Sequence, residues 1–154
     1  MRSVRTDHDP ITLGQSLTAP AQRLLARRTF PGQPGQVSVA RQWLTRLIDG
    51  FEAADEVLLA CSELAANAII HSDSGRPGGV FTVRVAVEPD IVRLEVLDQG
   101  GSWTRRRCHE NTAIHPEDAT QCGRGLTIVA AITSAWGIAG DHHGRTAWCE
   151  IKSQ

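Results

Sequence analysis

The spacing of apolar residues along the chain predicts three helices. Between residues 36 and 48 the apolar side chains recur at helical spacing, and Gly50 closes the segment. A second periodic segment covers about residues 53–70, and an apolar third covers residues 126–134. The second has the wide apolar face with which a helix packs on a sheet.

Alternation of apolar and polar residues predicts the strands. Two alternating segments flank the turn Pro89–Asp90, which indicates a pair of antiparallel strands. The expected strands are residues 22–30, 80–87, 91–97, 136–139 and 146–152. Strands and helices in this order predict an α/β (α+β) fold, a two-layer sandwich with helices on one face of a mainly antiparallel sheet.

Composition and charge indicate one domain. The chain has 154 residues, 41% of them hydrophobic, and a net charge of −1, so we expect a domain at residues 22–154 after a loose arm at residues 1–21. A charge this small gives no support to a nucleic-acid or membrane surface. There is no apolar run of about 18 residues and no signal-peptide core at the N-terminus, so we expect a cytoplasmic protein.

The four cysteines show no CxxC pairing and are interpreted as free thiols. The alternative is a zinc site built from Cys108, His109, His115 and Cys122, whose spacing matches no common ligand pattern.

Three polar residues recur at intervals of four within the second predicted helix. Glu63, Asn67 and His71 would form one stripe along its side. The ordinary explanation is that such a stripe faces water. The functional one is that Glu63 acts as a general base and that Asn67 offers an oxygen to magnesium, which needs few protein ligands when it also binds phosphates.

Two glycine-containing segments add further candidate chemistry. Asp98 ends an apolar strand before Gly100, where it could accept a hydrogen bond from an amine on a flat ring. Residues 123–126 (Gly-Arg-Gly-Leu) open the third helix, a suitable place for phosphate. Singly, each also fits an ordinary turn or hinge. Together with an irregular segment at residues 99–122, interpreted as a lid, they would supply metal, ring and phosphate contacts for one nucleotide.

These segments resemble the GHKL ATPase superfamily, which includes gyrase, MutL and the histidine-kinase catalytic domains. The likeness covers roughly residues 30–151 and is greatest to the anti-sigma-factor serine kinases, the RsbW-like branch. Ser102 stands where the first glycine box often has a second spaced glycine. The matching segments are residues 63–71 (N box), 98–100 and 123–129 (glycine boxes), and 136–137 and 144–148 (closing hairpin).

The resemblance implies a Bergerat-type pocket for ATP and Mg²⁺. In it Asn67 would hold magnesium, Asp98 would read the adenine amine and Thr146 would support that contact. Glu63 would be the catalytic base. The run Arg105–Arg107 in the lid could steady the γ-phosphate or be solvated. The nucleotide-binding residues implied are Asn67, Asp98, Gly100, Gly123, Arg124, Gly125, Leu126 and Thr146.

The resemblance also implies partners. Such kinases bind a sigma factor and phosphorylate a serine or threonine on an anti-anti-sigma antagonist, and they form homodimers. One alternative is a nucleotide-gated binding module without phosphoryl transfer. A two-component histidine kinase is disfavoured, because 154 residues leave no room for a phospho-acceptor helix pair or a sensor.

Overall fold

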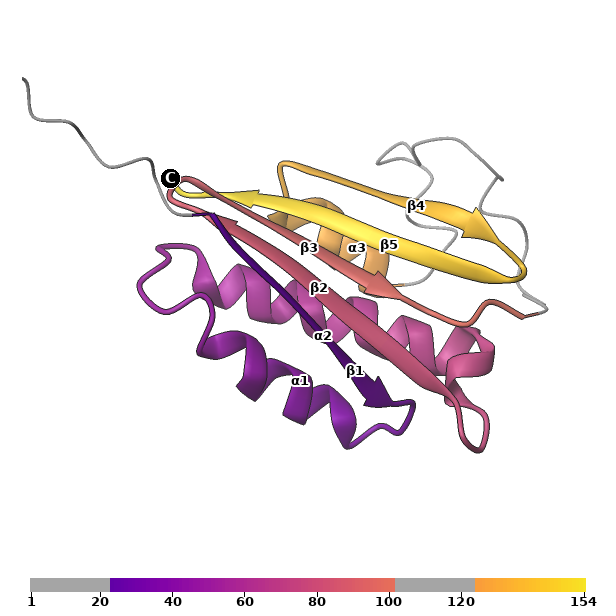
Figure 1. Ribbon diagram of the computed structural model, residues 1–154. Helices are drawn as coiled ribbons and strands as arrows, with labels where there is room; N and C mark the ends of the chain where they lie inside the picture. Colours follow the sequence, from indigo (N-terminus) through magenta and orange to yellow (C-terminus); the bar gives the residue numbers. More distant parts are fainter. Residues whose placement is uncertain (1–22, 102–123) are drawn as a thin grey trace, which may run out of the picture.

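A five-stranded antiparallel sheet carries helices on one of its faces (Figure 1). The computed structural model describes residues 23–101 and 124–154. The strands are β1 (Leu24–Pro31), β2 (Val80–Glu88), β3 (Ile91–Leu97), β4 (Ala135–Asp141) and β5 (Gly144–Lys152). The helices are α1 (Gln36–Thr45), α2 (Ala54–His71) and α3 (Arg124–Ile132), and a 3-10 turn, η1 (Asp73–Gly75), follows α2. The predicted two-layer sandwich is confirmed.

The strand order brings distant parts of the chain together at one end of β3. The order is β1-β2-β3-β5-β4, and each neighbouring pair is antiparallel. Because β5 lies beside β3, Leu97 pairs with Thr146. The first glycine box follows directly on β3 and therefore lies next to the β4–β5 turn.

The core lies between the sheet and the helices. Alternate residues of the central strands β2 and β3 point to the helices and are buried, as the period of two predicts. Phe30 of β1 joins the layers, since its ring lies 5.4 Å from that of Phe81 and 5.8 Å from that of Trp43 on α1. Burial of side chains of this size stabilises the fold by about 1.5–3 kcal/mol each.

Two of the cysteines belong to this core. Cys61 of α2 and Cys149 of β5 are buried free thiols, as predicted. Burial raises the pKa of each to about 12. They remain protonated at neutral pH and act as small apolar side chains. Cys108 and Cys122 lie outside the described residues, as does the alternative zinc site.

Element boundaries differ from the sequence-based expectations by a few residues. The first helix ends at Thr45 rather than at residue 48, and the N–H of Leu47 bonds at 2.9 Å to the carbonyl oxygen of Leu44, only three residues back, which closes a tighter turn than that of an α-helix. Ile48 is nevertheless buried, so the apolar spacing continued past the helix end. The third helix begins at Arg124, two residues earlier than predicted. Within the described residues, no helix is both long and apolar enough to cross a membrane.

Candidate functional site

Asp98 lies where β3 leaves the sheet, and backbone groups hold its carboxylate. Its Oδ1 accepts hydrogen bonds from the N–H groups of Gly100 at 2.7 Å and Arg145 at 3.2 Å. The N–H of Asp98 in turn donates to the carbonyl oxygen of Arg145 at 2.9 Å. Both carboxylate contacts use one oxygen. Within the described part of the chain, Oδ2 is thus left to accept from another donor.

Burial raises the pKa of the Asp98 carboxyl above its ordinary value of 3.8. The backbone hydrogen bonds from Gly100 and Arg145 and the charge of Arg145 oppose this shift, while the carboxylate of Asp73 adds to it. The folded protein therefore keeps a proton on Asp98 at a higher pH than an exposed aspartate would. A buried ionisable group beside a cavity is a candidate for ligand contact.

The first glycine box is fixed between η1 and the β4–β5 turn. Gly100 has a φ of +70°, and a Cβ there would lie only 2.2 Å from the carbonyl oxygen of His142. That carbonyl accepts the N–H of Gly101 at 2.8 Å, and the carbonyl oxygen of Gly100 accepts the N–H of Asp73 at 2.7 Å. Glycine is required at position 100 for both conformation and space.

Ser74 of η1 connects the end of α2 to the same box. Its side chain is fully buried, and its Oγ accepts the N–H of Gln99 at 3.0 Å. This hydrogen bond fixes Gln99, the residue after Asp98, to the turn that follows α2. The position of the Asp98 carboxylate therefore depends on that of α2.

Replacing Ser74 with alanine is expected to lower the free energy of unfolding by about 1–2 kcal/mol, because the partly buried N–H of Gln99 loses its acceptor. Urea unfolding measures this change. Ser62→Ala is the matched control. The Ser62 hydroxyl donates to a carbonyl within α2, so removing it leaves no buried donor without an acceptor. A Ser74→Ala protein as stable as wild type would show that the bond does not hold the box.

The polar stripe of α2 meets the start of α3. A Cβ on Gly125 would lie 2.8 Å from Oε2 of Glu63 and 3.5 Å from both the Nδ2 and Oδ1 atoms of Asn67. The glycine thus lets α3 approach these two side chains closely. Helix α3 begins at Arg124, which is exposed, so the positive end of the helix dipole lies beside Asn67.

Replacing Gly125 with alanine is expected to reduce any phosphoryl transfer roughly 10- to 100-fold, since the methyl group displaces the Glu63 carboxylate. Alanine suits a helix better than glycine, so stability should be unchanged or rise by up to about 1 kcal/mol. Phosphate incorporation and thermal unfolding measure the two effects. Gly35→Ala is the control, because a Cβ there meets no atom within 4 Å. Wild-type transfer by Gly125→Ala would contradict the contact with Glu63.

Asn67 and Asp98 line one cavity between α2, α3 and the strands β3, β4 and β5. Its volume is about 20 Å³, which suits a water molecule. A purine ring therefore enters only if a wall moves, and Arg145 has the most rotatable bonds of the lining. The other lining side chains are apolar, which suits a flat ring: Leu64, Ala68, Val96, Leu126, Ile138 and Ala147.

The structure does not bring every predicted residue to this cavity. Thr146 lies between Arg145 and Ala147, which line it, and among the described residues no hydrogen bond joins Thr146 to Asp98. His71, the last residue of α2, is also absent from the lining. Gly123 and the run at 105–107 lie outside the described residues.

Arg145 is the site residue that the sequence did not reveal. Its backbone N–H donates to Asp98, and the residue lines the cavity. The alternation of β5, counted from Cys149 and Ala147, would have indicated that residue 145 shares their face.

Among the described residues no group of three or more histidine, cysteine, aspartate or glutamate side chains forms a metal cluster. A metal here would depend on few protein ligands.

Comparison with known proteins identifies the family. The family described as the histidine kinase-like ATPase domain matches residues 30–148. The chain belongs to this family, which confirms the superfamily predicted from the sequence.

Several relatives fall within the predicted RsbW-like branch. The chain is 25% identical over 111 residues to "Serine-protein kinase RsbW" of Oceanobacillus iheyensis, covering 66% of this chain and 70% of that protein. It is 32% identical over 95 residues to "Anti-sigma F factor" of Clostridium acetobutylicum, covering 61% and 65%. The match thus spans slightly less than two thirds of the anti-sigma F factor.

A solved structure shares the fold. The crystal structure of the RsbU and RsbW domains of a Mycobacterium tuberculosis protein matches with a TM-score of 0.60 at 21% identity. The match covers 87% of this chain and 33% of that chain.

Proposed function

We propose that the chain is an ATP-dependent serine/threonine protein kinase that acts as an anti-sigma factor in the cytoplasm. The observation that carries this proposal is that Asn67 and Asp98 line one cavity, with Gly125 against Asn67 and Glu63 beside it. The relatives named serine-protein kinase RsbW and anti-sigma F factor support the activity and the class of partner.

Asp98 would select adenine. Its Oδ1 is held by two backbone N–H groups, so Oδ2 would accept the hydrogen bond of the exocyclic amine. Guanine has a carbonyl oxygen at the corresponding ring position, and two acceptors would then face each other. The apolar lining beside Asp98 would contact the ring faces.

The phosphates would lie at the start of α3. The free N–H groups of a helix N-terminus and the charge of Arg124 favour an anion there. Asn67 would hold Mg²⁺ through its amide oxygen, since magnesium prefers oxygen ligands and otherwise relies on phosphates and water. When bound, magnesium would neutralise charge on the phosphates.

Glu63 would accept the proton of the attacking serine or threonine hydroxyl. It lies one helical turn before Asn67 on the same stripe of α2 and close to Gly125, which places a carboxylate next to the proposed phosphate position. Phosphoryl transfer requires mainly positioning and charge stabilisation from the protein, and these residues can supply both.

The test is incubation with labelled ATP, magnesium and candidate antagonist proteins. We expect the label on a serine or threonine of one antagonist, and sedimentation of the kinase as a homodimer. ATP binding without any labelled antagonist would favour the nucleotide-gated module instead. Absence of ATP binding would contradict both functions.

A further inference from the structure

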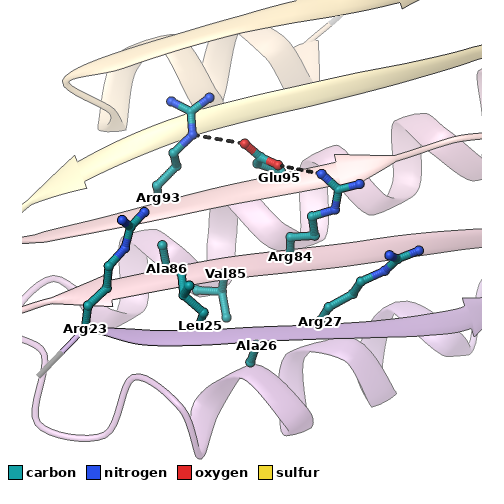
Figure 2. A pocket seen from close by; sticks show the side chains of 9 residues that line it. All are labelled: Arg23, Leu25, Ala26, Arg27, Arg84, Val85, Ala86, Arg93 and Glu95. Atoms are coloured by element: carbon teal, nitrogen blue, oxygen red, sulfur yellow. Dashed lines mark hydrogen bonds and ion pairs between the residues drawn. The ribbon is translucent and has the colours of Figure 1, made fainter.

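The face of the sheet opposite the helices carries a groove lined with arginines. We call this face the open face. Figure 2 shows the groove, which crosses β1, β2 and β3 and has a volume of about 400 Å³. Its polar lining consists of Arg23, Arg27, Arg84, Arg93 and Glu95, and the exposed side chain of Leu25 rises among them. The volume lies in the range of ligand sites.

The carboxylates of the open face neutralise only part of this charge. Arg93 pairs with Glu150 at 2.8 Å and with Glu95 at 3.0 Å, and Glu95 also lies 3.5 Å from Arg84. Arg23 pairs with Glu88 at 3.3 Å, but its side chain is 59% exposed. Within residues 23–101 and 124–154, Arg27 forms no ion pair. A net positive charge therefore remains between β1 and β2.

The sheet register places two of these arginines directly opposite each other. Arg27 of β1 pairs with Arg84 of β2, and both side chains lie on the open face (Figure 2). Like charges at directly opposite positions destabilise a sheet. Arg84 has Glu95 as a partner at 3.5 Å, but among the described residues Arg27 has no carboxylate partner, and an anion between the two guanidinium groups would be held from both sides.

The pattern along β1 and the residue just before it indicates the shape of the ligand. Arg23, Leu25 and Arg27 follow one another at intervals of two and share the open face. The two arginines are thus separated by about 13 Å along the chain direction, which a single phosphate or carboxylate does not span. Leu25 is 65% exposed between them and pairs with Ala86 across the strands.

We propose that this groove binds an extended acidic segment of a protein partner, with acidic and apolar side chains in alternation. One acidic side chain of the segment would contact Arg27 and Arg84, and a second would contact Arg23. An apolar side chain between these two acidic residues would cover Leu25. The site lies on the opposite side of the sheet from the cavity with Asp98, so the proposal does not depend on nucleotide binding.

The test is fluorescence anisotropy with a labelled peptide that alternates glutamate and leucine. Arg27→Ala combined with Arg84→Ala should weaken its binding about tenfold or more, and added salt should weaken binding to wild type. Arg28→Ala is the matched control on the same strand, since Arg28 lies over the Phe30 ring on the helix side, and it should bind within about twofold of wild type. Arg27→Ala removes no ion pair that the described residues form, and Arg84→Ala removes only the partly exposed 3.5 Å pair with Glu95, so the melting temperature of the double variant should stay within a few degrees of wild type.

A charge swap tests direct contact. The double variant Arg27→Glu with Arg84→Glu should no longer bind the glutamate–leucine peptide and should instead bind a peptide that alternates lysine and leucine. The proposal is overturned if the glutamate peptide does not bind, if a glutamine–leucine peptide binds equally well, or if the alanine variants bind normally. The proposal would also be overturned, in favour of another ligand class, if the protein bound polyphosphate or anionic vesicles more tightly than the glutamate peptide. A changed sedimentation mass in the arginine variants would overturn it too, because this face would then be a contact between copies.

Discussion

Replacing Asp98 with asparagine is expected to weaken ATP binding roughly 10- to 100-fold without loss of stability. The two backbone N–H groups that point at Oδ1 require an acceptor there, so the amide oxygen of asparagine would take that position. Its NH₂ group would then face the adenine amine, and two donors would oppose each other. Isothermal titration with ATP and magnesium measures the loss.

The stability of the same variant provides the control. Because burial raises the pKa of Asp98, the free energy of unfolding falls as the pH rises from 3.8 through the folded-state pKa, and the full cost of the ionised form is present above that pKa. The asparagine side chain carries no such charge, so Asp98→Asn should be at least as stable as wild type at pH 7, with the difference shrinking as the pH falls toward 3.8. Reduced affinity together with unfolding at lower temperature would instead indicate a structural role.

The raised pKa also predicts how binding depends on pH. ATP affinity should fall as the pH decreases through the folded-state pKa of Asp98, which lies above 3.8, since a protonated carboxyl no longer offers two acceptor oxygens. A parallel titration of Asp98→Asn with ATP, which has no carboxyl group at this position, separates this effect from general loss of fold, and a titration with GTP tests the selection of adenine. GTP binding as tight as ATP binding would contradict the role of Asp98.

Replacing Glu63 with alanine is expected to leave ATP binding within a few-fold of wild type and to lower phosphoryl transfer roughly 10²- to 10⁴-fold. The reason is that the carboxylate lies beside Gly125 on the stripe of Asn67 but is absent from the lining of the cavity with Asp98. Single-turnover transfer from labelled ATP to an antagonist measures the rate, and a titration with unlabelled ATP measures binding.

Two further variants sharpen this result. Glu63→Gln keeps the shape of the side chain without its basicity and should be as inactive as Glu63→Ala. Glu52→Ala, at an exposed position before α2, should be fully active. Transfer at the wild-type rate by Glu63→Ala would show that the base assignment is wrong.

The fold could be predicted from the sequence because its elements have clear periods. The alternation in β2 and β3 and the apolar face of α2 gave both the elements and the buried sides. The end of α1 could not be predicted, because Leu47 and Ile48 continue the apolar spacing in a turn rather than a helix. The strand order depends on contacts between distant segments, which a local pattern does not encode.

The site was predicted in part. The spacing of four in α2 placed Glu63 and Asn67 on one stripe, and the structure brings that stripe to Gly125. Which residue of β5 meets Asp98 depends on the register with β3, and that register puts Arg145 rather than Thr146 at the cavity. The anchoring of the glycine box by Ser74 depends on the path of η1, for which the sequence shows only a turn.

A crystal structure with a non-hydrolysable ATP analogue and magnesium tests the central claim most directly. We expect an enlarged cavity with the adenine amine within hydrogen-bonding distance of Asp98, a metal ion on the amide oxygen of Asn67, and phosphates at the start of α3. A nucleotide bound away from Asp98, or a metal ion held without Asn67, would contradict it.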